Sequence, residues 1–280
     1  MQESSDTPRR EDRNKKPFVS TRHRDAEPDT YEPNIPRLGR RENEPHSAEI
    51  TYLYDVLTTN FPDDRTMWDL HHYFKKNGIN IDIQFDISYF KGLNIPYDLP
   101  SYQAKDFDNR VPTMGINILS PSTWRSDLAE KLDYCRLVEI PLYLVFNSYH
   151  VATNIYKPPF ARAYLLQDNG DYKIKELRKV SINSSGEFVS DALIDVSDIV
   201  PFRIGLKKRE RKFKKDEPLY RLVLAKPDKN ELFLTENEIN KRTIEDQAKT
   251  IDNQAKTIDN QAKTIEKLRE ENLKLKEKLD

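Results

Sequence analysis

The segment over residues 110–146 constrains the fold of this 280-residue chain more than any other part of its sequence. Residues 114–119 are apolar and partly β-branched over the length of a strand, and a polar turn that can cap a helix follows them. Over residues 124–138, apolar side chains recur at three- and four-residue spacing, which predicts an amphipathic helix. Pro141 ends that helix, and residues 142–146 are apolar throughout, as in a strand covered on both faces. The segment therefore predicts a β-α-β unit in a sheet that is at least partly parallel.

Three further elements are predicted before this unit. A helix is expected to begin near Ser47 and to end at residues 60–62, and a second helix is expected over residues 65–76, ended by the Asn-Gly pair at 77–78. Strict alternation of apolar and polar residues over 81–88 predicts a strand. Its polar face is expected to carry Asp82, Gln84, Asp86 and Ser88.

The chain after the unit is expected to be antiparallel. Short strands are predicted over residues 151–156, 163–166 and 172–174, and a hairpin turn over 168–171 joins the last two. Residues 199–204 predict a further strand.

Composition excludes several classes of protein. The net charge of -1 provides no overall basic field of the kind that drives non-specific nucleic-acid binding, so any such contact must be local. The single cysteine, Cys135, lies on the apolar face of the predicted helix and is expected to be a small buried hydrophobe. No apolar run of 18 residues and no signal-peptide pattern is present, which favours a soluble cytoplasmic protein without a membrane partner.

Hydrophobic content divides the chain into three parts. Residues 1–45 are rich in charge and proline and are expected to form a disordered tail. Residues 46–235 alternate strands with helices and predict one α/β domain. Residues 236–280 contain a heptad repeat and predict a helix.

The heptad repeat favours a coiled coil. The sequence of residues 245–251 recurs, nearly unchanged, at 252–258 and 259–265. An Asn such as Asn272 at a core position favours a parallel dimer, so we expect self-association through residues 244–279. A single exposed helix is the alternative. One continuous stripe is formed by Ile244, Ile251, Ile258, Ile265, Asn272 and Leu279.

A cluster of basic residues over 207–215 could bind along a phosphate backbone, although such a run more commonly forms a solvated loop. Its members are Lys207, Lys208, Arg209, Arg211, Lys212, Lys214 and Lys215.

The β-α-β segment also resembles a known family. Its polar turn reads Ser-Pro-Ser-Thr at 120–123, and its helix supplies Asp127, Glu130, Lys131 and Tyr134. These residues resemble the Uma-two family of the PD-(D/E)XK nuclease superfamily, and the resemblance covers roughly Pro45 to Thr235. It implies a restriction-endonuclease-like core, in which a mixed sheet is flanked by helices, here extended by a C-terminal coiled coil.

The resemblance also implies a site. In this superfamily, carboxylates bind Mg²⁺ or Mn²⁺, which activates water for attack on a phosphodiester, and a lysine stabilises the developing charge. Asp86 matches the metal-binding aspartate, Lys131 matches the lysine, and Glu49 is a weaker match to an acidic residue on the first helix. Asn117 stands where the family has the strand glutamate, and Thr113 stands where it has an aspartate.

An amide at position 117 keeps one ligand oxygen but removes its negative charge, so affinity for a hard dication should fall. Two hypotheses arise for the chain. In the first, the chain is a metal-dependent DNA endonuclease that uses Asp86 and Lys131, and its catalysis is impaired because Asn117 is a poor metal ligand. Alternatively, it is a non-catalytic nucleic-acid-binding or scaffold module that oligomerises through its coiled coil.

Overall fold

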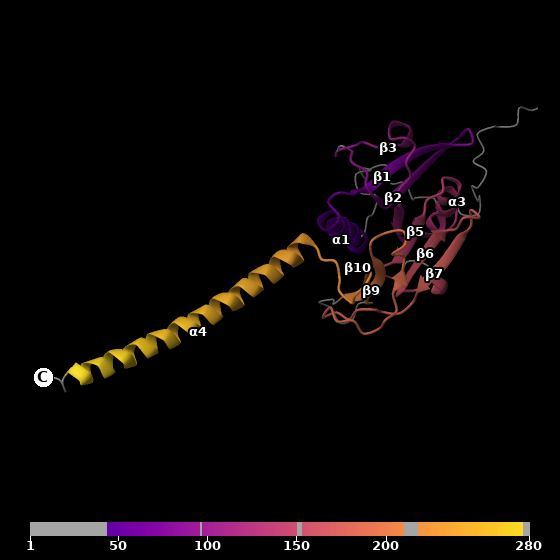
Figure 1. The fold of residues 1–280 in the computed structure, drawn as a ribbon. Helices are drawn as coiled ribbons and strands as arrows, with labels where there is room; N and C mark the ends of the chain where they lie inside the picture. The colour runs from indigo at the N-terminus through magenta and orange to yellow at the C-terminus, as the bar shows by residue number, and fades with distance from the viewer. Residues whose placement is uncertain (1–43, 96, 150–152, 210–217, 277–280) are drawn as a thin grey trace, which may run out of the picture. The chain divides into compact units, whose positions relative to one another are not determined.

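The structure is a computed structural model that describes residues 44–95, 97–149, 153–209 and 218–276 (Figure 1). The predicted disordered tail therefore lies almost entirely outside the described residues, as do Arg211, Lys212, Lys214 and Lys215 of the basic cluster. The chain divides into two units, one ending at Phe233 and one beginning at Leu234. The described helices are α1 (Glu44–Asn60), α2 (Trp124–Leu128), α3 (Glu130–Leu137) and α4 (Glu236–Lys276). The described strands are β1 (Arg65–Lys76), β2 (Ile79–Phe90), β3 (Tyr102–Gln103), β4 (Met114–Ile118), β5 (Leu142–Asn147), β6 (Phe160–Leu166), β7 (Tyr172–Leu177), β8 (Ile194–Asp195), β9 (Arg203–Arg209) and β10 (Leu219–Ala225).

The first unit is built on a mixed sheet of seven strands in the order β3-β1-β2-β4-β5-β6-β7. β4 and β5 are parallel and are joined through α2 and α3, which confirms the predicted β-α-β unit. β5, β6 and β7 then pair antiparallel, as expected, and the turn after β6 lies at the predicted residues. The α/β class with a mixed sheet flanked by helices is thus confirmed, as is the long C-terminal helix.

The helix predicted over residues 65–76 is wrong, because this segment is strand β1. It pairs antiparallel with β2 along nearly its whole length, from Arg65 opposite Phe90 to Lys76 opposite Ile79. Asn77 and Gly78 both have positive φ, of 52° and 78°, which is the backbone of a two-residue hairpin turn rather than of a helix end. The many pairs made with β2 outweigh the local helical spacing of the apolar residues.

The β1–β2 ladder is interrupted once, where Asp69 would pair with Asp86. Asp69 has φ 47°, and there the two strands exchange faces. Phe85 packs in the core on the α3 side of the sheet, whereas Ile87, two residues later, packs in the core beneath α1. Ser88 bonds to His72 in the α3-side core, so the prediction that it shares one face with Asp82 and Gln84 is wrong.

The predicted helix over residues 124–138 is broken at Ala129, whose backbone is not helical. The carbonyl of Asp127, in the turn at the break, accepts a hydrogen bond of 2.9 Å from the Tyr143 hydroxyl. The turn before the helix does not cap it through a side chain, because the Thr123 hydroxyl donates to the Asp127 carboxylate instead. Cys135 is fully buried, as predicted.

Two downstream predictions need correction. Residues 154–156 form a 3-10 turn, η3 (Asn154–Tyr156), rather than part of a strand, and residues 151–152 lie outside the described part. The strand predicted over 199–204 begins only at Arg203, because hydrogen bonds from Ile199 and Val200 to the carbonyl of Val196 close a turn before it.

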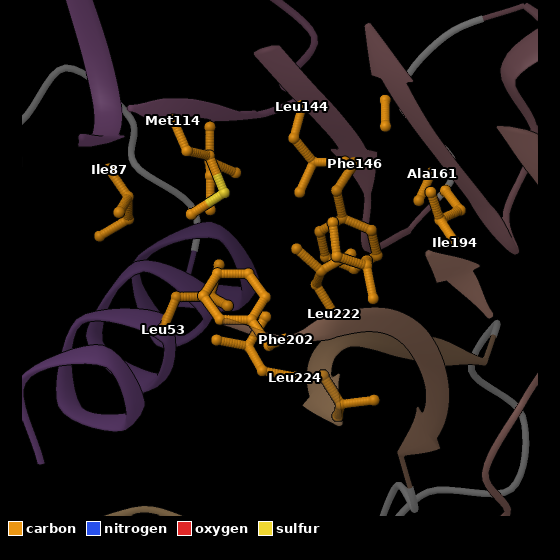
Figure 2. Packing of buried hydrophobic residues seen from close by; sticks show 14 of the residues in the cluster. Leu53, Ile87, Met114, Leu144, Phe146, Ala161, Ile194, Phe202, Leu222 and Leu224 are labelled. Carbon is orange, nitrogen blue, oxygen red and sulfur yellow. The ribbon is translucent and has the colours of Figure 1, made fainter. Parts of the chain in front are cut away.

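One face of the large sheet is covered by α1 and by a second sheet of order β10-β9-β8 (Figure 2). Leu53 of α1, Phe146 of β5 and Leu222 of β10 meet there in one buried cluster. The opposite face packs against α3, with Tyr143, Val145 and Cys135 in a second cluster. Gly115 of β4 lies under Phe85, and a Cβ at this position would come within 2.4 Å of the ring. The large sheet is therefore the middle layer, and β4 is close-packed within it.

The second unit is helix α4, which begins with a capping box. The backbone N–H of Glu238 donates to the Thr235 hydroxyl, and the backbone N–H of Thr235 donates to the Glu238 carboxylate. Ile244, Ile251 and Ile258 are each 65% exposed along the helix. No helix within the described residues is long and apolar enough to cross a membrane.

Stability should depend on pH through His72. Burial among aromatic rings lowers the pKa of His72 to about 4, because the charged imidazolium would lose its hydration there. The hydrogen bond between the imidazole and the Leu70 carbonyl opposes this shift but does not outweigh it. The unfolded chain therefore binds this proton near pH 6.5 and the folded chain does not. We expect the free energy of unfolding to fall by on the order of 3 kcal/mol as the pH drops from about 6.5 to about 4.

Urea unfolding at several pH values measures this slope. His72→Phe should flatten it, whereas His71→Gln, on the exposed neighbouring residue, should retain it. Equal slopes in the wild type and His72→Phe would contradict the prediction.

Candidate functional site

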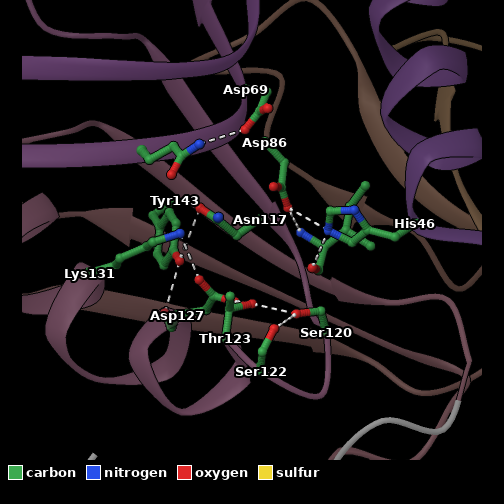
Figure 3. A network of polar contacts seen from close by, with 12 residues as sticks. His46, Asp69, Asp86, Asn117, Ser120, Ser122, Thr123, Asp127, Lys131 and Tyr143 are labelled. Carbon is green, nitrogen blue, oxygen red and sulfur yellow. Dashed lines mark hydrogen bonds and ion pairs between the residues drawn. The ribbon is translucent and has the colours of Figure 1, made fainter. Parts of the chain in front are cut away.

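Three residues that the sequence assigned to a site come together at the carboxyl end of β4 (Figure 3). Asn117 is the penultimate residue of β4, Asp86 lies on the neighbouring strand β2, and Lys131 lies in the first turn of α3. In Figure 3 the Asn117 side chain lies between Asp86 on one side and Lys131 and Tyr143 on the other. Asp127 lies beside Lys131 in the same view, and the charge of the Asp86 carboxylate raises the pKa of both groups.

Asp86 is held by the end of β4 and by α1. The backbone N–H of Ile118 donates to Asp86 Oδ2 over 2.6 Å, and His46 Nε2 lies 3.3 Å from the same oxygen. His46 Nε2 also lies 3.0 Å from the carbonyl oxygen of Ile118. Because Asp86 lies where the β1–β2 ladder is interrupted, its side chain can reach both β4 and α1. The Asp86 carboxylate therefore links three elements of the fold.

Lys131 is paired with a buried acid. Its Nζ lies 2.8 Å from Asp127 Oδ1, and the Thr123 hydroxyl donates to Asp127 Oδ2 over 2.8 Å. The Asp127 side chain is fully buried, whereas that of Lys131 is 18% exposed. Ser120 and Ser122 continue the network through their hydroxyls. Both carboxylate oxygens of Asp127 are thus engaged within the protein.

Asn117 is 2% exposed and faces the α3 side of the sheet, opposite to its neighbours Ile116 and Ile118. The Tyr143 hydroxyl lies 3.4 Å from Asn117 Oδ1, a long contact, and donates a shorter bond to the Asp127 carbonyl. The amide therefore adds no charge to the centre of the cluster.

Burial and charge shift the ionisation of this cluster. Burial raises the pKa of Asp127, against the opposing charge of Lys131. Burial alone would lower the pKa of Lys131, but the carboxylates of Asp127 and Asp86 outweigh it and raise that pKa. The 2.8 Å contact favours the ionised pair at neutral pH. Lys131 is therefore a cation whose charge is offset by Asp127, on the helix that precedes it.

The donor set fits a divalent metal poorly. Asp86 is the one predicted ligand with a carboxylate, and its Oδ2 already accepts the Ile118 N–H. Asn117 offers a neutral oxygen, and the oxygens of Asp127 are engaged by Lys131 and Thr123. Within the described residues, no group of three or more His, Cys, Asp or Glu side chains is placed to hold a metal ion.

The other predicted residues lie elsewhere. Glu49 is fully buried in α1, where Arg209 Nη1 lies 2.8 Å and Arg221 Nε 3.2 Å from its carboxylate, so it joins α1 to the second sheet. Arg209 belonged to the predicted basic cluster, but Glu49 offsets its charge. Lys207 and Lys208 lie on the same strand, β9. Thr113 accepts a hydrogen bond from the backbone N–H of Lys91.

Asp127 and His46 belong to the cluster but were not assigned to a site from the sequence. Asp127 and Lys131 are four residues apart, a spacing that could have indicated the ion pair. His46 lies before the predicted start of the first helix, and no local signal connects it with Asp86, from which it is separated by the rest of α1, by β1 and by the first part of β2.

No protein-family profile and no curated protein matches the sequence. Among solved structures, the chain is similar to one described as a "putative nuclease belonging to DUF820" from Anabaena variabilis ATCC 29413. The identity is 17% and the TM-score is 0.38, and the match covers 56% of this chain and 74% of the other. A similarity at this level carries no argument about function, so the function of the chain is inferred from the geometry of the cluster.

The buried ion pair yields a stability prediction. Lys131→Met would leave the Asp127 carboxylate buried without its counter-charge, so we expect a loss of about 3–5 kcal/mol in the free energy of unfolding at pH 7. The loss should shrink at acidic pH, because Asp127, whose pKa burial raises, can then be neutral.

Lys76→Met provides the matched control, because Lys76 and Glu139 form an exposed ion pair of 2.6 Å. Its loss should stay within about 1 kcal/mol. Chemical denaturation of the two variants makes the comparison, and similar losses would contradict a structural role for the Asp127–Lys131 pair.

Proposed function

We propose that this chain is a nuclease-like nucleic-acid-binding protein whose metal-dependent phosphodiester hydrolysis is impaired. The observation that carries the proposal is the convergence of Asp86, Asn117 and Lys131 at the carboxyl end of β4, with an uncharged amide at its centre. In sheets that contain parallel strands, ligands commonly bind at the carboxyl ends of those strands, where loops and helix starts supply polar groups.

Impairment is supported by charge and by hydrogen bonding. An amide replaces the carboxylate that a hard dication prefers, and the lysine that would stabilise a developing phosphate charge is neutralised by Asp127. Nucleic-acid binding is supported more weakly, by Lys207 and Lys208 on β9 and by the basic residues that come after them in the sequence.

Restoring the missing charge tests the proposal. Asn117→Glu should create a site for Mn²⁺, because a second carboxylate then lies beside Asp86. We expect Mn²⁺ at about 100 times its Kd to stabilise this variant by about 2.7 kcal/mol, a rise in Tm of several degrees, and to stabilise the wild type much less. Differential scanning fluorimetry over a Mn²⁺ titration gives the measurement.

Asn154→Glu is the matched control, because it adds the same charge at an exposed position in η3. It should respond to Mn²⁺ as the wild type does. If Asn117→Glu also responds like the wild type, the cluster is not a metal site lacking one charge, and the assignment to a nuclease-like site fails.

One observation favours an active enzyme as a second candidate. Asp127 brings a carboxylate into the cluster, so a rearranged site could use it with Asp86 if Lys131 moved away. Cleavage of plasmid DNA with Mg²⁺ or Mn²⁺, abolished by Asp86→Ala, would establish that candidate. Absence of cleavage over a range of metals and substrates would exclude it.

We further propose that α4 associates with a second copy of the chain as a parallel coiled coil. Its isoleucine stripe is exposed in a single chain, with Ile244 at 65% and Ile265 at 51%. Burying such side chains contributes on the order of 1.5–3 kcal/mol each. The pairs Asp252–Lys256 and Asp259–Lys263 lie off this stripe, at heptad positions that face away from the seam of a coiled coil.

Sedimentation velocity of the full chain tests the association. Ile251→Glu combined with Ile258→Glu should convert a dimer to the monomer of 33.0 kDa, because two charges would enter the seam. Asn253→Glu combined with Asn260→Glu adds the same charge outside the seam and should leave the dimer intact. A monomeric wild type at micromolar concentration would contradict the proposal.

A further inference from the structure

A second feature of the first unit is a surface cavity lined by aromatic side chains. Its volume is about 230 Å³, and Tyr54, Trp68 and Tyr97 line it together with Arg65 and Asp98. Trp68 is 58% exposed and Tyr97 is 62% exposed, although both are large and largely apolar. The Arg65 guanidinium lies 4.0 Å from the centre of the Tyr97 ring. The cavity therefore presents aromatic rings to solvent, whereas the guanidinium that contacts Tyr97 belongs to Arg65, which is only 8% exposed.

The interruption of the β1–β2 ladder accounts for this placement. Because the strands exchange faces at Asp69, Trp68 lies on the α1 side of the sheet, where its ring meets Tyr54 edge to face at 6.4 Å. Arg65 and Trp68 both lie at the start of β1. The cavity is thus built from α1, the first residues of β1 and the segment after β2.

The chemistry of the lining selects a class of ligand. The charge of Arg65 disfavours a cationic ligand, such as the ammonium groups that aromatic cages usually take. The volume is below that of sites for drug-sized molecules and suits one planar ring system. Aromatic faces and arginine planes stack nucleobases regardless of sequence, provided that the base is unpaired. Asp98, the acidic group of the lining, can accept a hydrogen bond from the Watson–Crick edge of an unpaired base, including the N3–H of thymine or uracil.

The geometry points to a binding site for an unpaired base of single-stranded nucleic acid, an inference that rests on the proposed function and specifies its substrate class. The cavity lies near the polar cluster. Trp68 pairs with Ile87, the residue next to Asp86. Tyr54 and His46 lie on the same helix, eight residues or about 12 Å apart. Trp68 is therefore one strand position from the residue opposite Asp86, and a single strand anchored by one base at Trp68 would be held next to Asp86.

Trp68 itself provides the reporter, because Trp124 is the other tryptophan in the sequence. In a Trp124→Phe background, with EDTA present, oligothymidylate should quench the fluorescence of Trp68, and a hairpin duplex should quench it much less. Trp68→Ala should weaken binding of a labelled oligothymidylate on the order of 10- to 100-fold in fluorescence anisotropy. Trp68→Phe should recover part of the affinity, because an aromatic ring remains.

Two further variants separate binding from folding. Tyr97→Ala removes the other highly exposed ring of the cavity and should also weaken binding, whereas Tyr73→Ala removes an exposed ring on β1 outside the cavity and should not. Oligouridylate in place of oligothymidylate distinguishes RNA from DNA, and binding of either supports the site.

The cavity proposal and the proposed function can fail separately in these experiments. If single strands leave Trp68 fluorescence unchanged, or duplex quenches it equally, the cavity proposal is overturned. The proposed function survives that result where the protein binds duplex in anisotropy or Asn117→Glu gains Mn²⁺ binding. A protein that binds no nucleic acid in any of these assays loses both the cavity proposal and the nucleic-acid-binding part of the proposed function.

Discussion

At Asp69 and Asp86 the β1–β2 ladder lacks one pair, and the two longest strands of the sheet exchange the faces on which their side chains pack. Ile81, Ile83 and Phe85 pack towards α3, and Ile87 and Tyr89 pack beneath α1. This exchange lets one hairpin contribute to both cores of the unit. Asp86 lies at the point of exchange, where its carboxylate can accept the Ile118 N–H and approach His46.

The same exchange determines the nearby surface. Had the strands alternated regularly, Trp68 would lie on the face where Leu70 packs against the α3-side core, rather than beside Tyr54 of α1. One interruption therefore positions both an acid at the centre of the sheet and an exposed aromatic ring near it. Positive φ at a residue other than glycine has a conformational cost, and the hydrogen bond from Gln84 to Asp69 helps to hold that conformation.

Local patterns predicted the parts of the fold that depend on neighbours in sequence. The β-α-β unit, the hairpin turn after β6 and the burial of Cys135 can be derived from spacing alone. The helix predicted over residues 65–76 failed because the Asn-Gly pair was interpreted as a helix end, although it is equally the strongest short hairpin signal. The face exchange was not predictable, because alternation over 81–88 continues unbroken in sequence while its partner strand imposes the interruption.

The candidate site, like the fold, could be predicted from the sequence only in part. Asp86, Asn117 and Lys131 could be proposed from the segment that resembles the nuclease family, but their ionic state depends on Asp127. A buried ammonium group needs a compensating anion, and the Asn117 amide cannot supply one. The Asp86 carboxylate is already bonded to the Ile118 N–H, and Asp127 makes the contact of 2.8 Å with the Lys131 ammonium. The lysine that a phosphodiesterase would direct at its substrate is thereby part of the packing between α3 and the sheet, and the architecture of the site can persist without its chemistry.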